Sequence, residues 1–471
     1  MLDYKTHFHG KKITIMGLGL LGRGVGDVEF LAACGAELIV TDLKTKKELA
    51  PSLRRLRKYP KITYVLGKHR LEDFRNQDMI LKAAGVPLDS PYVAKARKHR
   101  IPIEMDASLF MRLAPEVTFI GVTGTRGKST TTQLIYQILK KHLGLNRSQK
   151  RTVGPRASAP GLARKTLQSK VFLGGNVQGV ATLPLLAKVH PGDFVVAELD
   201  SWQLQGFGDA NLPAGKAGMS PPIAVFTNFM PDHLNYYRGS MQKYWDDKVN
   251  IFKWQKEGDV IVCGEGVSKR IKTRGDKIIA RTRDIPKSWK LLIPGVHNRE
   301  NAASAYHVGK ILGVKESVIR TTLEHFKGVP GRLELVRTWR GVEVYNDTTS
   351  TTPNALIAAL ETLGRKKKNV VLIAGGTDKN LEYGNAAQSI KKYVKAIIFF
   401  PGTATEKMKK LLPRGFEYTK VKSMKEGLKQ AVICSAKGDV ILLSPCAASF
   451  GLFKNEYDRG EQFNREVRKL S

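Results

Sequence analysis

The chain has 471 residues, of which 42% are hydrophobic, so it can form several buried cores, and domain sizes of roughly 100–200 residues indicate about three domains. It contains no apolar run of roughly 18 residues, and its start lacks the basic-then-apolar order of a secretory signal, which predicts a cytoplasmic protein without membrane insertion. The formal net charge of +36 attracts anions, but the basic residues are spread out without a known RNA-binding motif, so we expect no nucleic acid partner.

Short runs rich in valine and isoleucine alternate with helical stretches along the chain. The predicted strands are residues 12–17, 38–42, 117–123, 194–198, 223–228, 370–375 and 440–444. This alternation is typical of parallel sheets with crossover helices and predicts an α/β fold.

Turn-rich stretches divide the chain into three predicted domains. They lie at residues 111–115 and 327–332 and give the domains 1–113, 114–327 and 328–471. Two further stretches, 144–170 and 212–222, are rich in Gly, Pro, Ala and basic residues without periodicity, and we interpret them as surface insertions.

The first predicted strand leads into a glycine loop, Gly17-Leu-Gly-Leu-Leu-Gly22, and Asp42 closes the next strand. Such glycines let backbone N–H groups approach a diphosphate at a helix N-terminus, and the carboxylate can accept hydrogen bonds from a ribose or a base. The context predicts a Rossmann-like unit for NAD, FAD or a UDP-sugar. A tight strand-to-helix turn without a ligand is the alternative.

The third predicted strand leads into a second loop, Gly124-Thr-Arg-Gly-Lys-Ser-Thr130. It misses the strict P-loop spacing by one glycine, because Val122 stands where that glycine would be. The chemistry is retained: the N–H groups form an anion nest, Lys128 reaches the β- and γ-phosphates, and Ser129 or Thr130 can bind Mg²⁺. A purely structural turn is the alternative.

Polar side chains follow the next two predicted strands. Glu198 ends residues 194–198 at the carboxyl edge that binds ligands, which makes it a candidate second metal ligand. The run 223–228 opens into a polar loop with His233, followed by a helix that carries Lys248. Considered singly, a histidine and a lysine of this kind are more often structural or solvated.

Taken in order, the motifs of this chain resemble those of the Mur ligase family, most closely the branch that adds D-glutamate to UDP-N-acetylmuramoyl-L-alanine. The motifs are Gly17-Leu-Gly-Leu-Leu-Gly22, Gly124-Thr-Arg-Gly-Lys-Ser-Thr130, Leu173-Gly-Gly-Asn176, Glu198-Leu-Asp-Ser-Trp-Gln-Leu204, Asn228-Phe-Met-Pro-Asp-His233, Gly295-Val-His-Asn-Arg-Glu-Asn301, Arg332-Leu-Glu334, Asn346-Asp-Thr-Thr349, Gly375-Gly-Thr-Asp-Lys379, Leu443-Ser-Pro-Cys-Ala-Ala-Ser449 and Arg459-Gly-Glu-Gln-Phe463.

The resemblance implies an ATP-dependent ligase with a Rossmann-like domain for the UDP substrate, a central P-loop ATPase-type domain and a C-terminal Rossmann-like domain for the amino acid. Its substrates would be UDP-N-acetylmuramoyl-L-alanine, D-glutamate and ATP, joined through an acyl phosphate, and we expect a monomer. Two Mg²⁺ ions are implied: Ser129 and Glu198 would hold one, and His233 and Lys248 the other, with Lys248 as its carbamate.

The resemblance also implies binding residues. The ATP set is Gly124, Thr125, Gly127, Lys128, Ser129, Thr130, Asn298, Asn301, Arg332 and Asp347; the UDP-substrate set is Leu20, Leu21, Asp42, Gly85 and Asn176; the amino-acid set is Thr351, Lys379 and Ser449. Lys128, Glu198, His233 and Lys248 are the implied catalytic residues.

Three positions depart from the family pattern and concern the choice of incoming amino acid: Asp200 replaces a serine, Thr349 a lysine and Glu456 an aromatic residue. Another amino-acid ligase of the superfamily, such as a MurC-type ligase or a folylpolyglutamate synthase, shares the second loop and the histidine. A dinucleotide-dependent oxidoreductase is an alternative of a different class, but it leaves the Lys128 loop without a role.

Overall fold

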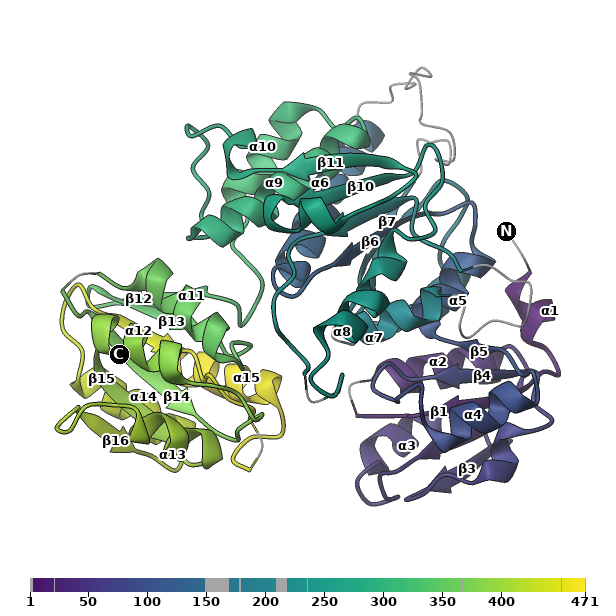
Figure 1. The fold of residues 1–471 in the computed structure, drawn as a ribbon, viewed down its shortest axis with the longest axis horizontal. Coiled ribbons are helices and arrows are strands. Elements are labelled where there is room, and N and C mark those ends of the chain that lie inside the picture. The colour runs from purple at the N-terminus through teal and green to yellow at the C-terminus, as the bar shows by residue number, and fades with distance from the viewer. Residues whose placement is uncertain are drawn as a thin grey trace. The chain divides into compact units, whose positions relative to one another are not determined.

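The computed structural model (Figure 1) describes residues 3–20, 22–148, 169–177, 179–208, 218–234, 236–365, 367–449 and 451–470. The chain forms two compact units. The first comprises Met1–Trp289 and Arg299–Glu324, and the second comprises Lys290–Asn298 and His325–Ser471. The first unit contains two sheets and the second unit contains one.

The first sheet has the strand order β3-β2-β1-β4-β5, and all its strand pairs are parallel. Its strands are β1 (Lys12–Met16), β2 (Glu37–Asp42), β3 (Ile62–Leu66), β4 (Met79–Lys82) and β5 (Ile103–Glu104). The accompanying helices are α1 (Tyr4–Phe8), α2 (Arg23–Ala33), α3 (Ala50–Leu56), α4 (Pro91–Lys98) and α5 (Asp106–Leu113). The first glycine loop therefore joins the carboxyl end of the central strand β1 to α2, as a Rossmann-like unit requires.

The second sheet has the order β11-β10-β9-β6-β8-β7 and is also parallel. Its strands are β6 (Thr118–Thr123), β7 (Val171–Gly175), β8 (Phe194–Glu198), β9 (Ile223–Phe226), β10 (Val260–Gly264) and β11 (Asp276–Ala280). Helices α6 (Lys128–Ser148), α7 (Ser201–Leu204), α8 (Met241–Lys248), α9 (Val296–Ile311) and α10 (Glu316–His325) accompany it, with 3-10 turns that include η2 (Leu183–Ala187), η3 (Gln205–Phe207) and η5 (Glu265–Arg270). The order places the ends of β7, β8, β6 and β9 side by side at one edge.

The third sheet has the order β12-β13-β17-β14-β15-β16. Its strands are β12 (Glu334–Trp339), β13 (Val342–Asn346), β14 (Val370–Gly375), β15 (Val394–Phe400), β16 (Tyr418–Lys420) and β17 (Val440–Leu443). Helices α11 (Pro353–Leu363), α12 (Gly384–Tyr393), α13 (Thr403–Lys410), α14 (Met424–Ile433) and α15 (Glu456–Arg468) cover it. This sheet is mixed, because β12 pairs with β13 in the antiparallel direction while the other pairs are parallel.

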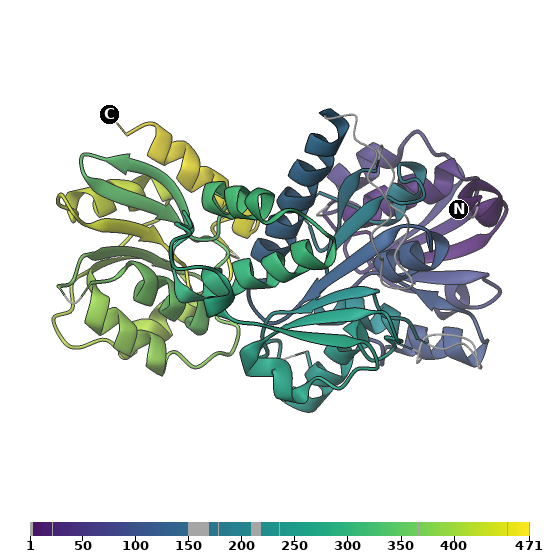
Figure 2. The same cartoon turned by 90° about the horizontal axis from the view of Figure 1, so that it is seen from above.

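Apolar burial holds each unit together. In the first unit one cluster extends through both sheets, and the ring of Phe119 lies 6.0 Å from Phe110 and 6.2 Å from Phe207. In the second unit α11, α12 and α13 pack on one face of the sheet and α14 and α15 on the other, as Figures 1 and 2 also show. Each sheet thus has helices that exclude water from its apolar strands.

The seven strands predicted from the sequence are all present, and the α/β class with three sheet domains is confirmed. The predicted insertion at 144–170 needs a correction at its start, because α6 continues to Ser148. Residues 149–168 and 209–217, which make up most of the two expected insertions, lie outside the described residues. The domain boundaries at 113 and 327 remain predictions. None of the described helices is both long and apolar enough to cross a membrane.

Candidate active site

The second loop, residues 124–127, joins β6 to α6, and two of its positions require glycine. Gly124 and Gly127 have φ values of 142° and 80°, which side chains rarely adopt. A Cβ atom at Gly124 would collide with the hydroxyl of Thr227, and one at Gly127 would collide with the amide of Asn301. The backbone of the loop is therefore packed against two neighbouring segments.

The segment after β9 fixes the shape of this loop. Thr125 donates its N–H to the carbonyl oxygen of Asn228 at 2.9 Å, and Arg126 donates its N–H to the Asn228 side chain at 2.8 Å. The Thr227 hydroxyl donates to the Arg126 carbonyl oxygen at 2.5 Å. Because the first-turn N–H groups of a helix lack intrahelical partners, the start of α6 offers donors to an anion at a preformed site.

Lys128 is the first residue of α6 and folds back over the loop. Its Nζ atom lies 3.1 Å from the carbonyl oxygens of both Gly124 and Thr125. Next to it, Arg126 forms an ion pair with Asp232 at 2.8 Å. The ammonium group is thus held at the mouth of the loop, where a phosphate would approach.

Glu198 ends β8 at the same edge of the sheet. Its strand runs parallel to β6 with Val122 opposite Glu198, and only 5% of the glutamate is exposed. Asn176, which follows β7, donates its backbone N–H to the Glu198 carbonyl oxygen at 2.6 Å. The structure thus brings Glu198 and Asn176 together one strand away from the loop.

Lys248, the last residue of α8, lies beneath the loop and is 1% exposed. Its Nζ atom donates to the Gly124 carbonyl oxygen at 2.9 Å and to the Thr123 hydroxyl at 3.2 Å, and it lies 5.1 Å from the centre of the Tyr244 ring. Burial, followed by the positive charge of Lys128, holds the pKa of Lys248 well below its usual range. The lowered pKa makes this amine easier to deprotonate than that of an exposed lysine.

His233 lies in the left-handed region, with a φ of 53°. Its ring centre is 4.8 Å from that of Trp202 and 6.1 Å from that of Tyr244, and its Nε2 atom is 3.7 Å from the Asp232 carboxylate. Burial lowers the pKa of His233, although Asp232 opposes this effect. A neutral imidazole with a free lone pair can serve as a metal ligand.

The residues expected at the UDP end surround the first glycine loop. Asp42 accepts backbone N–H groups from Leu18 at 2.9 Å, Gly19 at 3.0 Å and Lys44 at 2.8 Å, so its carboxylate shapes the loop. Leu20 is 52% exposed, and Gly85 is also exposed. Leu21 lies outside the described residues.

The expected ATP residues beyond the loop are divided between the two units. Asn301, in the first unit, accepts a hydrogen bond from the Thr131 hydroxyl at 3.3 Å. Asn298, Arg332 and Asp347 belong to the second unit, where Arg332 is exposed. Asp347 accepts from the Leu333 N–H at 3.1 Å and the Ser444 hydroxyl at 2.9 Å, and burial raises the pKa of Asp347 to about 7.

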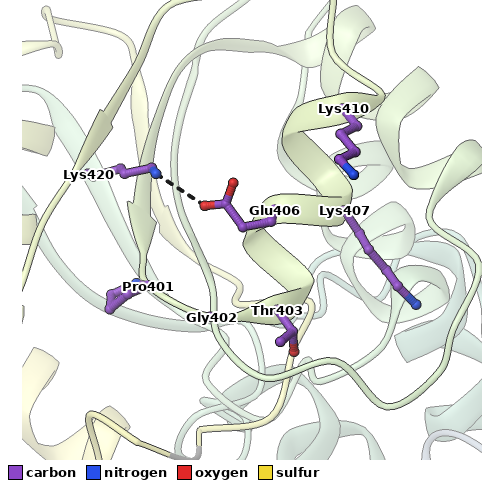
Figure 3. Close-up of a pocket in the computed structure, with 7 residues that line it drawn as sticks. All are labelled: Pro401, Gly402, Thr403, Glu406, Lys407, Lys410 and Lys420. Carbon is purple, nitrogen blue, oxygen red and sulfur yellow. Dashed lines mark hydrogen bonds and ion pairs between the residues drawn. The ribbon is translucent and has the colours of Figure 1, made fainter.

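The expected amino-acid residues come together at one edge of the third sheet. Lys379 donates to the Thr351 hydroxyl at 2.9 Å, and a bridge between Thr377 and Ala448 brings the neighbouring Ser449 close to the same loop. Asp378, beside Lys379, pairs with Lys407. Lys407 also lines the pocket of about 400 Å³ drawn in Figure 3, together with Pro401, Gly402, Thr403, Glu406, Lys410 and Lys420.

Models of three Mur ligase domains match the chain in order. They are the Mur ligase MurD-like N-terminal domain at residues 11–104, the Mur ligase middle domain at 122–276 and the Mur ligase glutamate ligase domain at 331–447. A UDP-N-acetylmuramoylalanine–D-glutamate ligase from Roseiflexus sp. (strain RS-1) is 34% identical, over 98% of this chain and 99% of the relative. This chain belongs to the Mur ligase family.

Further comparisons agree with that assignment. A ligase of the same name from Borreliella burgdorferi (strain ZS7) is 34% identical to this Mur ligase over 97% of each chain. Among solved structures, the UDP-N-acetylmuramate-alanine ligase MurC of Thermotoga maritima has a TM-score of 0.57 at 20% identity and covers 97% of this chain and 99% of its own. The MurF ligase of Thermotoga maritima in complex with ADP has a TM-score of 0.58 at 17% identity, with 100% and 98% covered. These structures support the fold.

As a member of the family, the chain is an ATP-dependent enzyme that forms amide bonds, which confirms the predicted enzyme class. The assignment speaks against the oxidoreductase alternative. Sequence reasoning missed several residues that shape the site of this ligase, including Thr227, Trp202 and Tyr244. Thr227 stands just before the polar Asn228 motif and Trp202 lies inside the motif at residues 198–204, so the sequence held a signal for these two but none for Tyr244.

Proposed function

We propose that this Mur ligase joins D-glutamate to UDP-N-acetylmuramoyl-L-alanine at the expense of ATP. Relatives with the name of that activity match the chain over almost its full length. The structural observation that carries the proposal is the loop at residues 124–127, which is shaped by Asn228 and whose Gly124 carbonyl oxygen is contacted by both Lys128 and the buried Lys248.

The loop and the start of α6 would hold ATP through Gly124, Thr125, Gly127, Lys128, Ser129 and Thr130. Backbone N–H groups and the Lys128 ammonium offset the charge of the phosphates, while Asn301, which touches Thr131, stands at the back of the loop. We further propose that Asn298, Arg332 and Asp347 bind ATP.

We propose that side chains at the sheet edge bind two Mg²⁺ ions. Ser129 and Glu198 would hold one through hard oxygen atoms, and His233 and a carbamate of Lys248 would hold the other. In the described parts of the chain no three His, Cys, Asp or Glu side chains cluster as a complete metal site. Phosphate and water oxygens would therefore complete the coordination, as is usual for Mg²⁺.

Carbamate formation on Lys248 requires the unprotonated amine. A neutral amine adds to carbon dioxide and then loses a proton, which turns a cation into a ligand that resembles a carboxylate. The burial of Lys248 lowers its pKa and so favours loss of the proton that this addition requires.

The proposed reaction has two steps. The carboxylate of the UDP substrate attacks the γ-phosphorus of ATP, the bond to ADP breaks, and an acyl phosphate forms. The amine of D-glutamate then attacks the acyl carbon, phosphate leaves with the bonding electrons, and the nitrogen loses a proton. Bound Mg²⁺ would neutralise phosphate charge; Lys128 does so from the protein, and the rigid loop holds the reacting groups in line.

Two further residue sets would position the other substrates. Leu20, Leu21, Asp42, Gly85 and Asn176 would hold the UDP-muramoyl part, with Asp42 acting by shaping the glycine loop. Thr351, Lys379 and Ser449 would hold the carboxylates of D-glutamate. We further propose that the domains divide at 113 and 327 and that the protein works as a cytoplasmic monomer.

A phosphate-release assay tests the proposed function. The protein is incubated with ATP, Mg²⁺ and UDP-N-acetylmuramoyl-L-alanine, and D-Glu, L-Glu, L-Ala and D-Asp are added in parallel. We expect phosphate release with D-Glu alone. The Lys128→Ala variant should release no phosphate, although its circular dichroism spectrum should show that the fold is retained. A response to another amino acid, or full activity of Lys128→Ala, would contradict the proposal.

A further inference from the structure

Lys82 is a buried lysine to which the proposed chemistry gives no role. It ends β4, is 2% exposed, and burial lowers the pKa of Lys82 to about 8. Its Nζ atom donates to the carbonyl oxygens of Ala83 at 3.2 Å, Ala84 at 3.4 Å and Val86 at 2.7 Å. The loop that contains Gly85 therefore curls around this one nitrogen.

Gln205, at the start of η3, connects Lys82 to the domain of the second sheet. Its Oε1 atom accepts from Lys82 at 3.4 Å, and its Nε2 atom donates to Asp247 at 2.8 Å and to the Tyr236 hydroxyl at 3.2 Å. The amide thus turns its oxygen to the cation and its NH₂ group to the carboxylate. A flipped amide would lose both contacts, so the charges at the two ends fix its orientation.

Asp247 carries this connection to α8. The same carboxylate oxygen accepts from the Tyr237 hydroxyl at 2.8 Å, so two donors hold it in place. The next residue in the helix is Lys248, whose amine is bonded to Thr123 and Gly124. A shift of Asp247 would therefore move the backbone that carries Lys248.

Packing alone does not explain a lysine at position 82. Burial of an ammonium is costly, and an unbranched apolar residue such as methionine would fill a similar volume without that cost. The surrounding unit already has an apolar cluster that extends through both of its sheets. A polar network whose members are hydrogen-bonded instead specifies one arrangement of the groups that it joins.

We propose that Lys82, Gln205 and Asp247 form a positioning relay that couples the loop at residues 83–86 to the placement of Lys248 on α8. The inference rests on the proposed function, which gives the loop to the UDP substrate and Lys248 to the metal site. Because coupling between two sites is reciprocal, binding of the UDP substrate and assembly of the Lys248 site then favour each other.

Hydrogen–deuterium exchange of the full chain tests the relay without reference to activity. Lys82→Met removes the ammonium group and keeps an unbranched side chain of similar length. We expect faster amide exchange in this variant at residues 83–86 and also at 241–248. Lys277→Met is the control, because Lys277 is an exposed lysine that also donates to two carbonyl oxygens, those of Ser268 at 3.3 Å and Ile271 at 3.2 Å, outside the proposed relay. Unchanged exchange at 241–248 in folded Lys82→Met would overturn the relay.

A double-mutant cycle measures the coupling. We expect Lys82→Met and Asp247→Asn each to raise the Mg²⁺ concentration for half-maximal phosphate release by about tenfold, with the double variant close to either single variant. Effects that multiply to about a hundredfold would show independent residues and refute the relay. If Lys82→Met does not fold, exchange at 83–86 in Asp247→Asn decides instead: faster exchange supports the relay and unchanged exchange refutes it.

The two proposals can fail separately. A parent protein that adds no D-glutamate would refute the proposed function, while the exchange experiment would still decide on the relay. A parent protein that adds D-glutamate, with Lys82→Met equal to it in exchange and in Mg²⁺ dependence, would refute the relay alone.

Discussion

At the scale of single residues, the environment of a side chain decides its chemistry more than its type does. Lys128 and Lys248 both contact the carbonyl oxygen of Gly124. Lys128 is partly exposed, whereas Lys248 is buried and carries a strongly lowered pKa. The first can act as a cation for phosphates, and the second loses its proton more readily than an exposed lysine does.

Replacement of Lys248 by arginine tests this distinction. A guanidinium stays charged and forms no carbamate, so we expect phosphate release to fall at least about a hundredfold, without recovery on addition of bicarbonate. Lys253→Arg serves as the control, because Lys253 is an exposed lysine that packs on the Trp254 ring and should tolerate the change. Full activity of Lys248→Arg would exclude Lys248 as a metal ligand.

The raised pKa of Asp347 predicts that the stability of the folded chain depends on pH. Its pKa lies at about 7 in the folded chain, above the usual value of 3.8, so the folded state keeps a proton that the unfolded state loses. The stabilisation from this proton is complete below pH ~4 and is lost as pH rises through ~7. Asp347→Asn removes the titration, so we expect the variant to gain thermal stability relative to the parent at pH 8 but not at pH 4, as thermal melts would show. An equal difference at both pH values would contradict this.

At the scale of elements, the carboxyl edge of the second sheet explains how distant segments form one site. Strands β7, β8, β6 and β9 end next to one another, so Asn176, Glu198, Gly124 and Asn228 meet although they are far apart in the sequence. The helix α6 begins at this edge, and its first turn therefore faces the phosphates.

Two glycines of this segment should respond in opposite ways to alanine. Gly127→Ala places a Cβ against Asn301 at a positive φ, so we expect at least about tenfold weaker ATP binding and a lower melting temperature. Gly144, inside α6, has nothing within 4 Å of an added Cβ, so Gly144→Ala should stabilise the chain by up to ~1 kcal/mol. Calorimetry with ATP and thermal melts would measure both, and normal ATP binding by Gly127→Ala would be inconsistent with the described loop.

Seven strands and both glycine loops were predictable from the sequence because each rests on a continuous segment. The other described strands were not predicted, and they include the antiparallel β12 and its partner β13, although the turn at Arg340-Gly341 fits a hairpin between them. The contacts of Asn228 with Arg126, and of Lys82 with Gln205, join residues more than a hundred positions apart. Such pairs depend on the tertiary arrangement, and no local pattern of the sequence indicates them.

At the scale of the whole molecule, the formal net charge of +36 should favour the binding of anionic substrates. ATP and a UDP-linked substrate are anions, and a positive protein field attracts them over distances that salt shortens. We expect KM for both to rise several-fold between roughly 50 and 500 mM KCl, with kcat nearly constant, since the bound groups are shielded from bulk ions. Steady-state kinetics at several salt concentrations would measure this. A constant KM would mean that the field does not contribute to capture.

The anchored phosphate loop has a consequence for nucleotide entry. Asn228 holds the backbone of the loop in place, and the Lys128 ammonium group donates hydrogen bonds to two carbonyl oxygens of that backbone. When ATP binds, its phosphate oxygens replace these carbonyl oxygens as the partners of the Lys128 ammonium group. The backbone of the loop is already ordered, so binding costs little conformational entropy. ATP uptake should then need little prior ordering of this loop.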